Sequence, residues 1–187
     1  AFVNEGIYTR PRTFTRVEDS NGNVILENEI QSNVAMKAST AALMNSILHD
    51  VVNGGTGSSA NFSGMTLAGK TGTTNDLRDR YFVGYSPYYV GACWVGYESN
   101  SRVSSGGVNP AAILWNKVMS QIHAGLENKN FFSSSDLVQV TVCADSGMLA
   151  SNLCEQDPRG SRVRYEWVAV DNQPTELCTM HDGSSML

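Results

Sequence analysis

Hydrophobic residues repeat with a helical period in two segments of the chain. The sequence between these segments contains apolar runs that are typical of β-strands. Residues 39–52 carry a wide apolar stripe and are followed by Gly54-Gly55, which predicts an amphipathic helix that ends at glycine. Pro110 precedes a second apolar stripe that runs to Leu126 and predicts another helix. Apolar, β-prone runs predict three strands between the helices, at residues 65–74, 81–85 and 90–97. The short links between these strands favour an antiparallel meander.

The two ends of the chain have a different pattern. Residues 7–17 and 24–26 flank an Asn-Gly turn, which predicts a β-hairpin. Residues 127–136 are rich in Asn, Lys and Ser, and a strand candidate at 138–143 is followed by mostly irregular sequence. We predict an α+β fold, an antiparallel sheet with helices packed on its faces that is incomplete at its N-terminal side. Residues 1–130 would form the main domain, and residues 131–187 a small cysteine-containing C-terminal extension.

Composition and charge exclude several classes of protein. The chain has 13 basic and 18 acidic residues among 187, and the basic residues are scattered, so we expect no nucleic-acid partner. No apolar run has the length of a membrane span, and the first residues do not resemble a signal peptide. Because the chain opens on Ala1 rather than Met, we expect a piece of a longer protein, with any targeting segment or membrane anchor before Ala1.

The chemistry of the chain is concentrated at residues 67–76, Leu-Ala-Gly-Lys-Thr-Gly-Thr-Thr-Asn-Asp. Lys70 is followed there by the hydroxyl groups of Thr71, Thr73 and Thr74, and Gly72 lets another backbone come close. Hydroxyl and backbone N–H donors beside an ammonium group suit the binding of a carboxylate or an oxyanion. In a strand, Thr71 and Thr73 point to one side, and Lys70 reaches that side only through its long stem.

A nucleotide-binding loop is the first alternative for this segment. Residues 64–71, Gly-Met-Thr-Leu-Ala-Gly-Lys-Thr, satisfy the phosphate-loop pattern. That pattern binds phosphate only between an apolar strand and a helix that begins at the lysine. Polar residues 58–63 precede the pattern, and Gly72 would break the helix, so we treat this match as a coincidence.

Lys-Thr-Gly on a strand is an element of penicillin-binding proteins and serine β-lactamases. Residues 69–76, together with residues 79–87 (Asp-Arg-Tyr-Phe-Val-Gly-Tyr-Ser-Pro), resemble the transpeptidase domain of class A penicillin-binding proteins. The segments 4–8 and 55–57 agree with this resemblance, and the cysteine-containing tail is similar to C-terminal extensions of Gram-positive members. The resemblance covers nearly the whole chain, and residues 1–130 would be the C-terminal portion of that domain.

This resemblance implies peptidoglycan D,D-transpeptidation through a serine acyl-enzyme, outside the cytoplasmic membrane and without a cofactor. Lys70 would contribute to the proton network, and the backbone N–H of Thr73 to the oxyanion hole. Thr71, Gly72, Thr73 and Thr74 would bind substrate. The partners would be stem peptides ending in D-Ala-D-Ala, β-lactams, and the upstream half of the same protein. A carboxypeptidase or β-lactamase is a nearer alternative, which the block at Asn75-Asp76 and the aromatic run after it disfavour.

The nucleophile of such an enzyme is a serine with a lysine three positions later, and no serine in this chain has one. Ser59-Ala60-Asn61 spells a second element of the family, but it lies too close to Lys70. We therefore expect both elements before Ala1, so that this chain alone is inactive. A non-catalytic module that binds carboxylates or acts as a scaffold is the alternative from a different class.

The four cysteines allow more than one chemistry. Cys93 lies in an apolar run, where a buried free thiol is expected, and a disulfide can form among Cys143, Cys154 and Cys178. Alternatively these three cysteines and His181 form a zinc site, although the gap between Cys143 and Cys154 fits no zinc-ribbon spacing. We assign no metal ligand, and a disulfide, a zinc site or neither stays open.

Two tryptophans and two histidines carry expectations that concern packing. Trp94 and Trp115 each lie in an apolar segment, so we expect both to fill the core. His49 and His123 lie in predicted helices, and we expect them at the solvent edge rather than as ligands.

Overall fold

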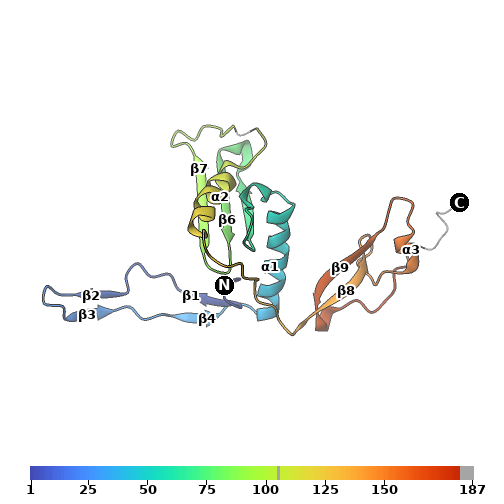
Figure 1. Ribbon diagram of the computed structural model, residues 1–187, viewed down its shortest axis with the longest axis horizontal. Helices are drawn as coiled ribbons and strands as arrows, with labels where there is room; N and C mark the ends of the chain where they lie inside the picture. The colour runs from blue at the N-terminus through green and yellow to red at the C-terminus, as the bar shows by residue number, and fades with distance from the viewer. Residues whose placement is uncertain (105, 182–187) are drawn as a thin grey trace. The chain divides into compact units, whose positions relative to one another are not determined.

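The computed structural model describes residues 1–104 and 106–181 of the chain and divides the chain into two units, Ala1–Phe132 and Ser133–Leu187 (Figure 1). The first unit is a three-stranded sheet with two helices and a long hairpin. The second unit is a small two-stranded sheet with short helical turns. No helix among the described residues is both long enough and apolar enough to cross a membrane.

The central sheet of the first unit is the predicted antiparallel meander. It consists of β5 (Ala68–Thr73), β6 (Asp79–Tyr85) and β7 (Val90–Gly96) in the order β5-β6-β7. In β5 and β6, Lys70 pairs with Val83, and Thr73 pairs with Arg80. The antiparallel sheet and its helices confirm the α+β prediction.

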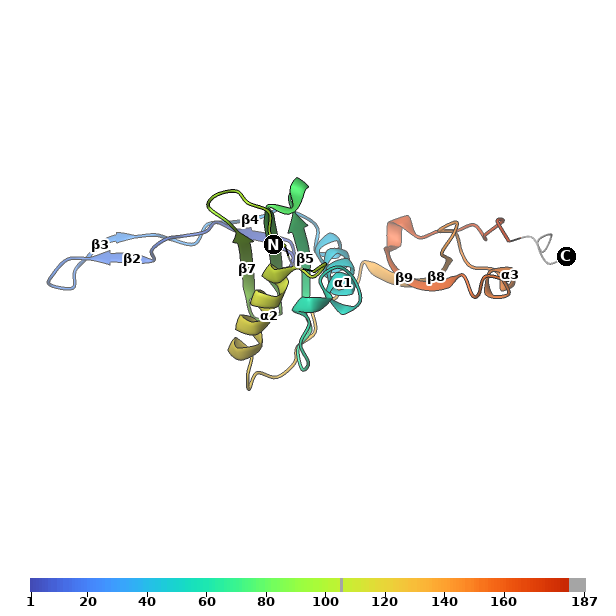
Figure 2. The ribbon, with the colours of Figure 1, turned by 90° about the horizontal axis from the view of Figure 1, so that it is seen from above.

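Two helices pack against this sheet, α1 (Ala38–Asn53) beside β5 and α2 (Pro110–Ile122) beside β6 and β7 (Figure 2). Helix α1 ends at Gly54, as predicted, and the N–H of Gly54 donates to Asp50. Its N-cap is Lys37, which makes no side-chain cap hydrogen bond. Helix α2 begins with Pro110, and the side-chain oxygen of Asn109 accepts from the first backbone N–H groups.

The core of the first unit lies where α2 meets the sheet. Trp115 and Phe82 are fully buried there in an edge-to-face contact, with ring centroids 5.2 Å apart. Gly84 and Gly91 leave room for the indole of Trp115, whose Nε1 donates to the carbonyl oxygen of Gly91. The burial of Trp115 confirms its predicted role.

Two of the packing expectations are wrong. Trp94 is half exposed, because Gly91, Cys93 and Val95 face the core around Trp115 and the alternation of β7 sends Trp94 to the opposite face. Its Nε1 donates to Asp79. His123 is buried, because one ring nitrogen lies 2.7 Å from the hydroxyl of Ser86 and the other 2.7 Å from the carbonyl oxygen of Met119. The ring therefore has partners inside the protein in place of solvent.

The hairpin before α1 is built from two pairs of short strands. β1 (Ile7–Thr9) pairs with β4 (Ser32–Val34), and β2 (Arg16–Glu18) pairs with β3 (Val24–Glu27). At the predicted turn, a carboxylate oxygen of Asp19 accepts from two backbone N–H groups, those of Asn21 and Asn23. Every residue of these four strands is exposed, so local turn chemistry and pairing hold the hairpin.

The second unit pairs β8 (Leu137–Cys143) with β9 (Val163–Ala169) over seven residues. The four-residue helix α3 (Asn152–Glu155) lies between them, and the 3-10 turn η3 (Val170–Asn172) follows. Strand β8 was predicted, whereas β9 and α3 lie in sequence expected to be mostly irregular. Two further 3-10 turns, η1 (Ser58–Ala60) and η2 (Asn75–Leu77), belong to the first unit.

Candidate functional site

The predicted site residues lie on and directly after β5. Lys70, Thr71, Gly72 and Thr73 belong to this strand, and Thr74 follows its last residue. All five are at least partly exposed, whereas Ala68 and Gly69 at the start of the strand are buried. The strand therefore leaves the core as it reaches Lys70 and presents the polar segment at the surface.

The ammonium group of Lys70 lies near the hydroxyl group of the next residue, Thr71. Lys70 Nζ lies 3.1 Å from the carbonyl oxygen of Thr71 and 3.4 Å from its Oγ1. Thr71 Oγ1 also lies 3.1 Å from the hydroxyl of Thr56. Because alternation sends Lys70 and Thr71 to opposite faces, the long lysine stem has to cross the strand. It does so in the structure, which places one cation and two hydroxyl groups together.

A second cation, the guanidinium group of Arg80, contacts the hydroxyl group of Thr73. Arg80 pairs with Thr73 across β5 and β6, and Arg80 Nη1 donates to Thr73 Oγ1 over 3.3 Å. Directly paired residues share one face of a sheet, so Thr71 and Thr73 lie on the same face as Arg80. Arg80 was not among the residues predicted for the site. The signal that could have found it is its place opposite Thr73 in a short β5–β6 connection.

The connection after β5 is tied down by a separate set of contacts. Thr74 Oγ1 accepts from the backbone N–H of Asp79 over 2.9 Å and lies 3.3 Å from its carboxylate, which also accepts from Trp94. Asp76 and Leu77 both have positive φ angles, 63° and 60°, which side chains rarely adopt. Thr74 thus anchors the loop, whereas the hydroxyl groups of Thr71 and Thr73 contact Lys70, Thr56 and Arg80 on the exposed part of the strand.

Two glycines allow the chain to turn tightly between the end of α1 and the site. A Cβ atom at Gly55 would lie 2.9 Å from the Cα of Val51, and one at Gly57 would lie 3.2 Å from the ring of Phe82. The N–H of Gly57 donates to the carbonyl oxygen of Val51. This tight turn after the helix brings Thr56 to Thr71, a contact that was not predicted from the sequence.

The geometry of a phosphate loop is not met. Lys70 lies inside β5 rather than at the start of a helix, so the helical N–H groups that would face a phosphate are not aimed at its position. The arrangement instead offers hydroxyl groups, two cations and the backbone of a strand at the margin of the sheet. These groups can hold an extended ligand that carries a carboxylate.

The second unit contains a separate group of candidate ligands. Four side chains each offer one atom, and these atoms lie within 4.8 Å of one another. This group, named here the Cys3His cluster, consists of Cys143, Cys154, Cys178 and His181. The cysteines are free thiols in the structure, as is Cys93 in β7.

Comparison with known proteins gives the family. Residues 1–120 match the family model of the penicillin-binding protein transpeptidase domain, and residues 133–183 match that of the penicillin-binding protein 1A C-terminal domain. Penicillin-binding protein 1A of Clostridium perfringens is 38% identical over 183 residues, which is 96% of this chain and 22% of that protein. This chain thus spans about a fifth of that curated relative.

Solved structures agree on the fold. A crystal structure of penicillin-binding protein 1A from Haemophilus influenzae covers 95% of this chain and 31% of its own chain, with a TM-score of 0.72 and 18% identity. The D,D-transpeptidase domain of a peptidoglycan glycosyltransferase from Eggerthella lenta covers 66% and 29%, with a TM-score of 0.55 and 25% identity. The family match extends over more than half of the chain, so this chain belongs to the penicillin-binding protein transpeptidase family.

Proposed function

We propose that this chain supplies the substrate-binding strand of a serine-type peptidoglycan D,D-transpeptidase, with residues 1–130 as part of the catalytic domain and residues 131–187 as an extension. The observation that carries the proposal is β5, where Lys70, Thr71 and Thr73 gather at an exposed strand margin. The similar structure from Eggerthella lenta is that of a D,D-transpeptidase domain, which supports this reaction class.

In this proposal the ligand is a stem peptide ending in D-Ala-D-Ala, or a β-lactam that mimics it. Thr71 and Thr73 hold the terminal carboxylate, and the charges of Lys70 and Arg80 favour it. Gly72 and Thr74 shape the strand and its end, where the ligand backbone lies alongside. A carboxylate held by hydroxyl groups and two cations is fixed in orientation, which places the scissile carbonyl at a defined position.

The reaction needs two further groups. The backbone N–H of Thr73 is one donor of the oxyanion hole, and a single donor of this kind contributes about 3 kcal/mol to the transition state. The serine nucleophile and its lysine come from a segment outside these 187 residues, because the chain contains no serine followed by lysine three positions later. Lys70 takes part in the proton network around that serine.

The intact protein in this proposal works outside the cytoplasmic membrane, where peptidoglycan is cross-linked, and is held there by a segment that this chain does not include. Its partners are the glycan-linked stem peptides and the half of the protein that carries the nucleophile. The chain alone binds no penicillin covalently, since it has no acylated residue of its own.

The test uses fluorescent penicillin on this chain and on a hybrid enzyme. In the hybrid enzyme, this chain replaces the 183 matching residues of penicillin-binding protein 1A from Clostridium perfringens. We expect no covalent label on the chain alone and a label on the hybrid enzyme. The replacement Lys70→Ala should abolish the label, whereas Lys129→Ala, on an exposed lysine that stacks on Tyr88, should leave it unchanged.

Two results would contradict the proposal. A covalent penicillin adduct on the chain alone would place the nucleophile within these residues. A folded hybrid enzyme that binds D-Ala-D-Ala peptides reversibly but never acquires a label would instead favour the non-catalytic carboxylate-binding module. Thermal unfolding of the hybrid enzyme, compared with that of the Clostridium perfringens protein, shows whether a missing label results from misfolding.

A further inference from the structure

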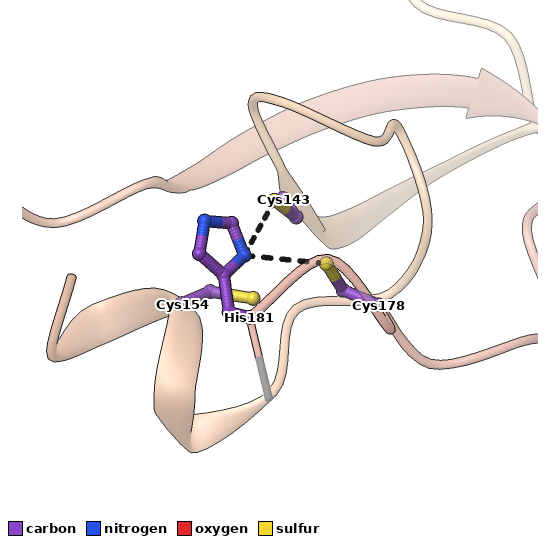
Figure 3. A group of neighbouring side chains, drawn as sticks. All are labelled: Cys143, Cys154, Cys178 and His181. Atoms are coloured by element: carbon purple, nitrogen blue, oxygen red, sulfur yellow. Dashed lines mark hydrogen bonds between the residues drawn. The ribbon is translucent and has the colours of Figure 1, made fainter. Parts of the chain in front are cut away.

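The Cys3His cluster has the dimensions of a tetrahedral metal site. His181 Nδ1 lies 3.4 Å from the sulfur of Cys178 and 3.6 Å from that of Cys143. In a tetrahedral zinc site, with Zn–S near 2.3 Å and Zn–N near 2.0–2.1 Å, ligand atoms lie about 3.5–3.8 Å apart. Figure 3 shows the three sulfur atoms and the imidazole ring turned toward a common centre. These two distances are close to those of a zinc site, and all four donor atoms lie within 4.8 Å of one another.

Backbone pairing brings these ligands together from three separate segments. The backbone of Leu149 pairs with Val142 on one side and with Leu177 on the other. Each of these two residues precedes a ligand, so the bridge places Cys143 and Cys178 next to each other. The carbonyl oxygen of Cys154 accepts from the N–H of Arg162, which ties the third sulfur to the start of β9. This explains why the cysteine spacing fits no zinc ribbon.

The second nitrogen of His181 is held as in metal-bound histidines. Nε2 lies 3.0 Å from a carboxylate oxygen of Asp157 and 3.3 Å from one of Asp145. Arg159 and Arg162 hold these two carboxylates in turn. A histidine that donates its outer N–H to a carboxylate keeps its other nitrogen free as a ligand. The lone pair of Nδ1 then points at the sulfur atoms.

The sulfur atoms also receive hydrogen bonds that suit thiolates. The backbone N–H of Asp145 lies 3.4 Å from the sulfur of Cys143, and that of Ser151 lies 3.3 Å from the sulfur of Cys154. Such donors stabilise negative charge on sulfur. They do not compete with a metal ion for the remaining lone pairs.

The C-terminal unit has little else to hold it together. Within residues 133–181, the buried hydrophobic side chains are those of Val142 and the three cysteines of the cluster. A unit of this size with so small a core commonly needs a disulfide or a metal ion for stability. The cluster therefore occupies the place where the fold needs a cross-link.

We propose that the Cys3His cluster binds one Zn²⁺ ion as a closed structural site that stabilises the C-terminal unit. Three thiols release their protons to solvent as the ion binds, and the imidazole binds in its neutral form through Nδ1. Four protein ligands complete the tetrahedron, so the site offers no open position for a substrate. This site goes beyond the proposed transpeptidase function, which uses residues of the other unit alone.

A disulfide is the alternative to a zinc site, and it would involve only two of the four side chains of the cluster. A bond between two of the sulfurs would leave the third thiol buried beside the imidazole, with no function for the convergence of all four groups. Zinc binding uses all four donors and protects the thiols from oxidation. The distinction is measurable, because a disulfide removes two hydrogens from the protein mass and zinc adds an ion.

The full 187-residue chain is purified with a reducing agent and supplied with Zn²⁺. Its mass under native conditions is then compared with its mass under denaturing conditions. We expect one zinc ion per chain in the native spectrum and none after denaturation. Cys154→Ser and His181→Ala should lose the ion, whereas Cys93→Ser, a matched control on a cysteine outside the cluster, should retain it. His181→Cys should also retain it, because four thiolates form an equally good site.

A second readout uses the unaltered chain and the one ligand variant that is expected to keep the ion. With Co²⁺ in place of Zn²⁺, the unaltered chain should show the visible absorption of a tetrahedral site with thiolate ligands, and His181→Cys should shift that absorption. Excess chelator should make residues 133–181 susceptible to protease while the first unit stays resistant. A chain without zinc, with all its thiols reactive under native conditions, would overturn the proposal. So would a disulfide within the cluster after purification in reductant.

Discussion

Arg80 Nη1 lies 3.3 Å from the hydroxyl of Thr73, directly across the β5–β6 ladder. The guanidinium group thereby sets the rotamer of a threonine that would otherwise turn freely at an exposed strand end. It also leaves the oxygen of Thr73 as an acceptor from Arg80, so the hydroxyl hydrogen is available to a ligand. One pair of residues thus connects the fold of the sheet to the chemistry of the candidate site.

Thr73→Val in the hybrid enzyme should slow acylation by penicillin. The change keeps the shape of the side chain and removes the hydroxyl that would hold the ligand carboxylate. A hydrogen bond to a charged group contributes about 1.5–3 kcal/mol, which corresponds to roughly a 10- to 100-fold lower rate of labelling. Thr9→Val, in the exposed strand β1, is the matched control and should label at the unaltered rate.

Arg80→Ala should have a smaller effect of the same kind. It removes the partner of Thr73 without removing the hydroxyl, and a hydrogen bond of ordinary strength is worth about 0.5–1.5 kcal/mol. We expect roughly a 2- to 10-fold slower labelling of the hybrid enzyme. If Arg80→Ala labels as fast as the unaltered protein, then Arg80 does not position Thr73.

Gly69→Ala should destabilise the first unit, although Gly69 is not among the residues proposed to bind the ligand. An added Cβ would lie 2.6 Å from the ring of Phe82 and 2.9 Å from the Cα of Gly84. Overpacking of this kind costs about 1–3 kcal/mol, which denaturant unfolding followed by circular dichroism would measure. Gly54→Ala, where an added Cβ meets nothing within 4 Å, is the control and should change the free energy of unfolding far less.

Trp115→Ala should lower the free energy of unfolding by more than Trp94→Ala does. Trp115 is 1% exposed, so its truncation should cost about 3–5 kcal/mol of unfolding free energy. Trp94 is 50% exposed, and its loss removes mainly the hydrogen bond to Asp79, worth about 1 kcal/mol. Equal losses for the two variants would contradict the burial that the structure assigns.

The hairpin turn should be sensitive to acid. Three hydrogen bonds, the largest from the side chain of Asn23, hold the pKa of Asp19 below its ordinary value of 3.8. A carboxylate with a lowered pKa stabilises the folded state above that ordinary value, and the stabilisation is lost as the pH falls through the lowered pKa. The protection of the Asn21 and Asn23 amides, measured by NMR as the exchange rate relative to that of an unstructured peptide at the same pH, should therefore fall in acid. Asp19→Asn, which does not titrate, should remove that pH dependence.

Asp157→Asn should weaken zinc binding without removing a ligand. The carboxylate of Asp157 holds the outer nitrogen of His181, and loss of such a partner typically lowers metal affinity about 10- to 100-fold. Competition with a chromophoric chelator measures the change. Asp136→Asn, an exposed residue of the same unit whose side chain lies outside the cluster, should bind zinc as the unaltered chain does.

The elements with a buried face could be predicted from the sequence, because burial imposes a period on the residues. Helix α1, helix α2 and the meander follow that rule, and their bounds differ from the predicted ones by a few residues. Strand β9 has no residue in the buried class, so a hydrophobic run was not available to reveal it. The alternation of Val163, Tyr165 and Trp167 with charged residues would have indicated it.

The candidate site was predictable to the extent that it is local. The segment from Lys70 to Thr74 could be recognised as one run, whereas Arg80 and Thr56 reach it through strand pairing and a helix end. The Cys3His cluster depends on the pairing of Leu149 with two distant segments. The spacing of the ligands along the sequence does not indicate that pairing. Trp94 was expected in the core because its segment is apolar, but Cys93 and Val95 face the core and Trp94 lies on the opposite face of β7, which the run of apolar residues does not indicate.

Strand β5 forms one margin of the three-stranded sheet that the structure describes. An unpaired strand margin invites association with other chains, and a lysine that points outward there is a common safeguard, because its charge opposes stacking of a second copy. Lys70 is exposed at that position, so we expect its charge to oppose self-association of the 187-residue chain. The light scattering of Lys70→Ala should accordingly rise with protein concentration, through self-association, while that of Lys129→Ala should not.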